Sequence, residues 1–299
     1  AYVIPDSVTS ISEGAFADCI SLTILVPSKA KHEEDTFRGC KEVIYYDNIA
    51  DIADDFIFIE YEDGWKVVKY VGSDNDIVFP DNINGNTYTI GDSIFLDSGI
   101  TSVHISSGVK KIGRSAFFNC ERLSQVTFEE GVTEILPSAF ANTKLKSVTL
   151  PNSLLQLGET DRKYSYEDSG VFSGCADLES VQFGDRLTTI GSFTFAQCRS
   201  LKHVTVPDNV NELGESVFYD CRNLNTVYLS ETTTEIPSAT FRGCQSLTNV
   251  NIPSSITDIG AYAFSDCSSL QKINLHNNIT DIGDGAFSEI GRASCRERV

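Results

Sequence analysis

The strongest constraint on this chain is a sequence repeat with a period of 23 residues. Between Leu178 and Ser288 a phenylalanine recurs at this spacing, and in every copy but the last a cysteine follows three residues later. The phenylalanines are Phe195, Phe218, Phe241, Phe264 and Phe287. Repeats of roughly 20 to 50 residues are typical of solenoids, in which each unit buries its apolar face by stacking on its neighbours.

The apolar residues of one unit indicate how the chain folds. Val204 and Val206 alternate with polar residues, as a strand with one buried face requires. Pro207 then ends the strand, because proline has no N–H to donate to a sheet. Gly214 suits a corner, and Phe218 would fill the space behind the strand. We therefore predict a leucine-rich-repeat solenoid of stacked units, with a parallel β-sheet on one face and short corners and turns on the other.

The positions where the repeat stops and resumes divide the chain. We expect the C-terminal end of a first repeat array at residues 1–47, a linker and β-hairpin cap at 48–72, a second array at 73–289, and a non-native tail at 290–299. The chain starts inside a unit and contains no methionine. We therefore also expect it to be a fragment of a longer protein.

The segment between the two arrays has the pattern of a β-hairpin. Two apolar stretches, Phe56–Tyr61 and Trp65–Tyr70, flank an Asp-Gly turn at Asp63 and Gly64. The first strand of a solenoid leaves backbone groups unpaired and apolar surface open. We expect the hairpin to cover that end of the second array.

A longer step between Phe140 and Phe172 marks an inserted loop at residues 159–170. Insertions in repeat proteins form surface loops, often on a binding face. Tyrosines flanked by charges are residues of the kind that make contacts with partners. The candidate binding residues of the loop are Arg162, Tyr164 and Tyr166. The alternative is a tolerated loop without a binding role.

Eight of the nine cysteines occupy the same position of successive units. They are Cys19, Cys40, Cys120, Cys175, Cys198, Cys221, Cys244 and Cys267. No pair has the C-x-x-C spacing of a metal site, so we expect no metal and no other cofactor. Stacking would place neighbouring sulfurs about 5 Å apart, which does not exclude disulfides. We favour free buried thiols, because in a regular ladder each sulfur has two equivalent neighbours.

Motifs and charge exclude several classes of function. The four histidines occupy unrelated positions, and the sequence contains no zinc-protease, serine-hydrolase or phosphate-loop motif, so we expect a non-catalytic protein. A formal net charge of −19 disfavours nucleic acid and anionic membranes as partners, because both repel an acidic surface. No apolar run reaches the ~20 residues that a membrane span needs.

The outward positions of the predicted strands form a candidate binding surface. These positions hold mostly neutral hydrogen-bonding residues, although the chain as a whole is strongly acidic. The candidates are His104, Thr127, Thr149, Gln182, His203, Thr205, Tyr228, Asn251 and Asn274. An extended neutral face suits a protein or glycan ligand. The alternative is a hydrated sheet surface that binds nothing.

Two units, residues 201–221 and 247–267, closely resemble BspA-like leucine-rich repeats. In both, a Val-Pro or Ile-Pro pair is followed by valine or alanine and then by Phe-x-x-Cys, and the resemblance extends over nearly the whole chain outside 47–72 and the tail. Similar proteins are bacterial or protist surface proteins that adhere to host matrix proteins and to other cells. The resemblance implies an extracellular recognition protein whose partner is a cell-surface protein, a matrix protein or a glycan.

The resemblance carries no fixed binding motif, so it supplies no site residues. Two other functions stay open at this point. One is a structural spacer that projects another domain, and the other is a glycan-binding accessory module of a secreted enzyme.

Overall fold

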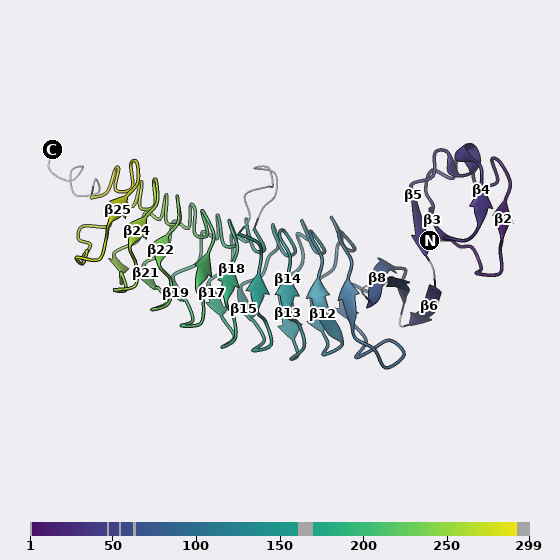
Figure 1. Cartoon of the computed structure of the whole chain (residues 1–299), viewed down its shortest axis with the longest axis horizontal. Helices are drawn as coiled ribbons and strands as arrows, with labels where there is room; N and C mark the ends of the chain where they lie inside the picture. The colour runs from purple at the N-terminus through teal and green to yellow at the C-terminus, as the bar shows by residue number, and fades with distance from the viewer. Residues whose placement is uncertain (1, 47, 54, 62–63, 161–169, 292–299) are drawn as a thin grey trace.

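The computed structural model describes residues 2–46, 48–53, 55–61, 64–160 and 170–291. The chain forms a β-solenoid of short parallel strands, and the described residues contain one helix, η1 (Glu34–Phe37). Figure 1 shows the turns of the second array stacked side by side, with the first array beyond the N-terminal end of that stack. The predicted leucine-rich-repeat architecture is confirmed.

A first line of strands lies where the sequence predicted it. It consists of β9 (Asp76–Val78), β11 (Ser102–Ile105), β13 (Gln125–Phe128), β15 (Ser147–Thr149), β17 (Ser180–Gln182), β19 (His203–Thr205), β21 (Thr226–Tyr228) and β23 (Asn249–Val250). Parallel pairing divides the line into three sheets, β9-β11-β13, β15-β17 and β19-β21-β23. Residues 272–274 of the last unit form no strand.

A second line of short strands adds to the predicted architecture. It consists of β10 (Tyr88–Ile90), β12 (Val109–Ile112), β14 (Glu134–Ile135), β16 (Gln156–Leu157), β18 (Thr189–Ile190), β20 (Glu212–Leu213), β22 (Glu235–Ile236), β24 (Asp258–Ile259) and β25 (Asp281–Ile282). Several of these strands run into a glycine corner. A Cβ on Gly214 would lie 2.3 Å from the backbone N of Ser192 in the preceding turn. Glycine is needed there because successive turns touch.

The core of the second array contains a continuous row of stacked phenylalanine rings. From Phe95 to Phe287, consecutive ring centroids are 5.0 to 5.8 Å apart and the ring planes lie within 19° of parallel. All of these rings are buried except the last, which is partly buried. The prediction that Phe218 fills the space behind the strand is confirmed, and stacking adds attraction to burial.

The repeat cysteines form a second regular row. Within the described residues the eight are free, and six of them have no exposed surface. In the second array each thiol donates a hydrogen bond to the carbonyl oxygen of the phenylalanine one turn earlier, at 3.0 to 3.2 Å. Cysteine suits the position because it is small, apolar and a weak donor. The prediction of free buried thiols is confirmed for these six.

The predicted hairpin is present and extends the second line of strands. β7 (Phe56–Tyr61) and β8 (Gly64–Tyr70) pair antiparallel, and β8 pairs in parallel with β10. A further strand, β6 (Asn48–Ala53), pairs with β7 in the segment that the sequence indicated as a linker. Phe56 and Phe58 pack into the core of the second array, as expected of a cap.

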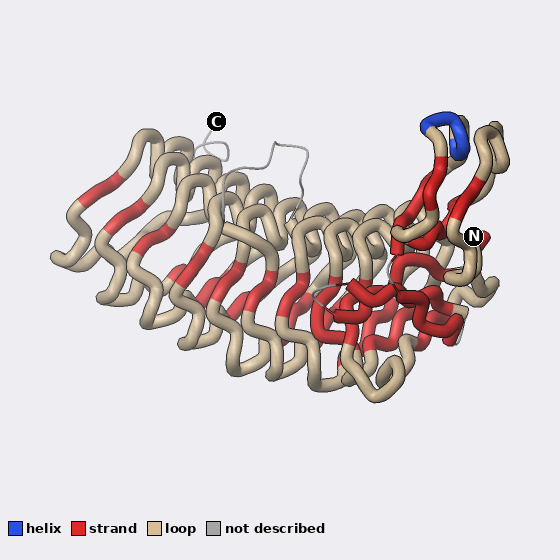
Figure 2. Tube along the Cα trace, turned by 45° about the vertical axis from the view of Figure 1, so that its right-hand side comes forward, coloured by secondary structure: helices blue, strands red, loops and turns tan. Residues whose placement is uncertain are grey.

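The first array is smaller than the second. One sheet contains β1 (Tyr2–Val3), β3 (Thr23–Pro27) and β5 (Glu42–Tyr46), and β2 (Ser10–Ile11) pairs in parallel with β4 (Lys31–His32). The inward residues of these strands form a separate core. Figure 2 shows the strands of this array next to those of the hairpin.

The first array meets the hairpin through the outward side of its sheet. Leu25 and Tyr46 are buried in one cluster with Ile57 and Ile59 of β7, and Val3, Ile44 and Val68 pack against this cluster. Alternation along β7 therefore sends one set of side chains into each array. The hairpin is a cap for the second array and a cover for the sheet of the first.

The described chain ends just beyond the last repeat. Ile290 takes the position of the repeat cysteine and packs, partly buried, against the core. Residues 292–299 lie outside the described residues, so the non-native tail stays a prediction.

Candidate recognition surface

The outward side chains of the first line of strands, here called the strand face, form an exposed surface of the second array. They are exposed because they alternate with buried residues such as Val148 and Val204. Two of the nine sequence candidates, His104 and Asn251, are half-buried. The exposed candidates are Thr127, Thr149, Gln182, His203, Thr205, Tyr228 and Asn274. Asn274 lies in the unit without a strand.

Strand pairing brings three candidates together. In the pairing of β19 with β21, His203 lies opposite Thr226, and Thr205 lies opposite Tyr228. Neighbouring strands are about 4.8 Å apart, so His203, Thr205 and Tyr228 form one patch. The Tyr228 ring is 49% exposed. Within the described part of the chain no other side chain or backbone group pairs with these three side chains, so their polar atoms are available to a ligand.

Other candidates are engaged within the protein. Nδ1 of His104 lies 2.8 Å from Oγ1 of Thr127, and Nε2 of His104 lies 3.5 Å from Oε1 of Glu129. Oδ1 of Asn251 accepts a hydrogen bond of 2.6 Å from the backbone N–H of Leu229. These side chains link neighbouring turns, which makes them less available than the His203 patch.

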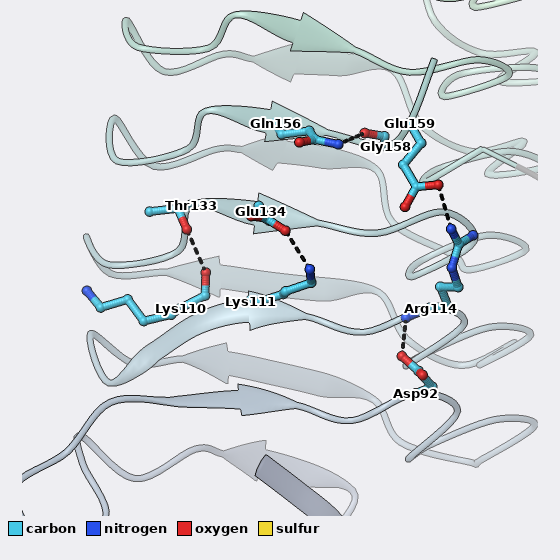
Figure 3. A network of polar contacts seen from close by, with 9 residues as sticks. All are labelled: Asp92, Lys110, Lys111, Arg114, Thr133, Glu134, Gln156, Gly158 and Glu159. Carbon is cyan, nitrogen blue, oxygen red and sulfur yellow. Dashed lines mark hydrogen bonds and ion pairs between the residues drawn. The ribbon is translucent and has the colours of Figure 1, made fainter. Parts of the chain in front are cut away.

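Charged residues occupy several outward positions of the second line of strands. Figure 3 shows its N-terminal part, where cations and carboxylates pair between turns. Nζ of Lys111 lies 2.6 Å from Oε2 of Glu134, and Nη2 of Arg114 lies 2.5 Å from Oε2 of Glu159, two turns further on. Asp92 accepts a hydrogen bond from the backbone N–H of Arg114.

Further along the second line, the outward residues of four successive strands are acids, and none of them was among the predicted binding residues. They are Glu212, Glu235, Asp258 and Asp281. A shallow pocket of about 380 Å³ lies beside the last three. The available signal was an acid directly before the inward isoleucine or leucine of four successive units, Glu212-Leu213, Glu235-Ile236, Asp258-Ile259 and Asp281-Ile282. No group of three or more potential metal ligands occurs among the described residues. These four acids thus lie on the second line of strands and not on the strand face.

The buried thiols are poor nucleophiles. Burial raises the pKa of the Cys175 thiol to about 11 and that of the Cys267 thiol to about 12. Both are therefore protonated near neutral pH, whereas reactive cysteines have lowered pKa values.

The loop candidates cannot be placed on this surface. Arg162, Tyr164 and Tyr166 lie outside the described residues, between Thr160 and Gly170. In the described chain no helix has the length and apolar character to cross a bilayer.

Solved structures resemble this fold. A leucine-rich repeat protein of T. pallidum has a TM-score of 0.54 at 24% identity, and the match covers 75% of this chain and 91% of that one. The pneumococcal vaccine antigen PcpA has a TM-score of 0.47 at 18% identity, covering 97% and 69%. A leucine-rich cell surface protein of Faecalibacterium prausnitzii has a TM-score of 0.35 at 23% identity, covering 81% and 92%.

Sequence comparison gives the family. No curated protein matches the chain significantly. The family model described as the BspA type leucine rich repeat region matches residues 1–57, 75–169 and 165–292, in six copies. Repeats of this kind are typically non-catalytic and typically mediate protein binding. Because the matched regions cover most of its length, the chain belongs to the BspA-type leucine-rich repeat family.

Proposed function

We propose that this chain is a recognition module, working outside the cell, that binds a protein or glycan ligand through the strand face of the second array. One observation carries the proposal. The strand face of the second array is mostly exposed and, apart from Asp76 on β9, mostly neutral on an acidic protein, whereas the corresponding face of the first array is apolar and covered by the hairpin.

The His203 patch is the part of the strand face that supports binding best. Its imidazole, hydroxyl and phenol groups have hydrogen-bonding capacity that the described fold leaves unused. The half-exposed ring of Tyr228 adds apolar contact area, and tyrosine is enriched among the residues that dominate binding energy. A neutral patch also binds a neutral ligand without the cost of stripping water from a charge.

The experiment measures binding of the full chain to a panel of extracellular-matrix proteins and glycans. The test variant combines His203→Ala, Thr205→Ala and Tyr228→Ala. The matched control combines Thr189→Ala, Asn211→Ala and Thr234→Ala, three neutral residues on or beside the second line of strands. We expect saturable binding that the test variant loses and the control retains. Equal loss in both variants, or none in either, would contradict binding at the strand face.

A structural spacer is the second candidate, and the continuous phenylalanine stack favours it. A row of rings with nearly constant spacing runs through the second array, as expected of an extended body built from equivalent turns. If the folded chain binds nothing on the panel, the spacer becomes the better description.

A further inference from the structure

The repeat cysteines occur in two environments. Those of the second array have no exposed surface and sit among buried neighbours. Cys19 and Cys40, the two cysteines of the first array, are half-exposed. Solvent and small solutes therefore have access to the first pair, whereas reaching the others requires opening of the core.

Backbone pairing holds Cys19 and Cys40 next to each other. The N–H of Asp18 donates to the carbonyl of Arg38 at 2.7 Å, and the thiol of Cys40 donates to the carbonyl of Phe16 at 3.1 Å. The first contact lies directly before Cys19 in the sequence, and the second is made by Cys40 itself. Both join the turn that contains Cys19 to the turn that contains Cys40. Turns paired in this way keep equivalent Cα atoms about 5 Å apart, inside the 4.4 to 6.8 Å range of disulfides.

Cys40 also has a single cysteine neighbour. No cysteine occurs in the sequence between Cys40 and Cys120, and the turn after Cys40 leads into the hairpin. In the second array an inner cysteine such as Cys221 lies between two equivalent sulfurs, so no pair is preferred. Cys40, in contrast, has one neighbouring cysteine with which it can pair, Cys19.

We propose that Cys19 and Cys40 form a disulfide that links the two turns of the first array when a small-molecule disulfide is available. In the first step one cysteine thiolate attacks the small disulfide, forming a mixed disulfide and releasing one thiol. In the second step the other cysteine attacks the protein sulfur of the mixed disulfide and releases the second thiol. The two cysteines are oxidised, and the small disulfide is reduced to two thiols.

The link stabilises the weaker of the two arrays. Among the described residues, the core of the first array has five buried apolar residues, Ile4, Ile11, Ile24, Val26 and Ala30, whereas the core of the second array runs its whole length. A cross-link between Cys19 and Cys40 closes a loop of about 20 residues, which restricts the unfolded chain. Burial and the neighbouring Cys19 raise the pKa of Cys40, so closure is expected to be faster at higher pH.

The test uses the full chain carrying Cys295→Ser, so that only the repeat cysteines react. The folded protein is incubated with oxidised glutathione, free thiols are blocked with N-ethylmaleimide, and the peptides are mapped by mass spectrometry. We expect loss of two thiols per chain and a peptide in which Cys19 is linked to Cys40. The cysteines of the second array are expected to react only after unfolding in denaturant.

Two results would overturn the proposal. One is recovery of Cys19 and Cys40 as separate glutathione adducts or as unreacted thiols. The other is linkage of Cys198 to Cys221 to the same extent, which would remove the distinction between the arrays. A Cys40→Ser variant is the control, and in it Cys19 is expected to remain as a glutathione adduct without closing a protein disulfide.

Discussion

The same repeat produces two strand faces with opposite environments. In the first array the outward positions hold Val3, Leu25 and Ile44, which the hairpin covers. In the second array most of the equivalent positions hold hydroxyl, amide or imidazole side chains, and most of these are exposed to solvent. The scaffold fixes where these side chains point, and their chemistry decides whether the face packs against another element or remains free. The first array therefore illustrates, within one chain, how a strand face accepts a partner.

The largest expected effect concerns the cores beneath these faces. Phe218 is fully buried between the rings of Phe195 and Phe241, with centroids 5.8 and 5.6 Å away. Phe218→Ala should lower the free energy of unfolding by about 3 to 5 kcal/mol, measured by urea denaturation. The matched variant Phe16→Ala removes a ring that is only partly buried in the first array. Equal losses in the two variants would contradict the difference between the cores.

The next effect tests the covered face directly. Leu25 is 1% exposed and packs against the hairpin, so Leu25→Ala should cost about 2 to 4 kcal/mol in docking of the first array. The measurement is limited proteolysis between the arrays, which should become faster. Thr149→Ala, at an outward position of the second array, is the control and should change unfolding by less than about 0.5 kcal/mol. Unchanged proteolysis in the Leu25 variant would show that the cover is not needed.

A pH effect sharpens the same comparison. The hydroxyl of Tyr46 donates to the carbonyl of Ile4, and burial raises the pKa of Tyr46 to about 12. The unfolded tyrosine ionises near pH 10, so the stability from this group is complete below pH 10 and is lost as the pH rises through about 12. We expect proteolysis between the arrays to accelerate over this interval. In a Tyr46→Phe variant this dependence should be weaker, and an identical profile would contradict the assignment.

The smallest expected effect concerns the open face. Replacing His203, Thr205 and Tyr228 with alanine should change the free energy of unfolding by roughly 0.5 kcal/mol per site or less, because these residues lie on the surface. Denaturation of the triple variant measures this directly. A loss of several kcal/mol would indicate that the patch contributes to folding, and the binding comparison with that variant would then have no meaning.

Periodicity predicted the features that recur in every unit. The positions of Phe218 and Cys221 repeat at a constant spacing, so one unit was enough to place the ring and the thiol in the core. The hairpin was also predictable, because its Asp-Gly turn lies between two apolar stretches. The second line of strands was not predicted, because most of its strands have only two residues and show no alternation of their own.

Long-range packing accounts for the rest. His104 contacts Thr127 and Glu129, which lie one turn away. The type of residue at position 104 alone could not reveal these contacts. The burial of both sides of β3 is visible in the sequence. Ile24, Leu25 and Val26 form an uninterrupted apolar run, which is typical of a strand covered on both faces. A cover over both faces of this strand was not predicted.

The hairpin that belongs to two cores also determines how the molecule would extend under tension. A pull between the first array and the last turn passes through residues 48–72, because this segment is the covalent path between the arrays. In the described residues, the apolar contact between the first array and the hairpin is one small cluster, and a hydrogen bond of 3.4 Å from Nζ of Lys69 to Oγ1 of Thr23 adds to it. The inner turns of the second array, in contrast, are held on both sides. The joint is therefore expected to yield first. Fully straightened, those residues would span at most about 80 to 90 Å while the second array stayed folded.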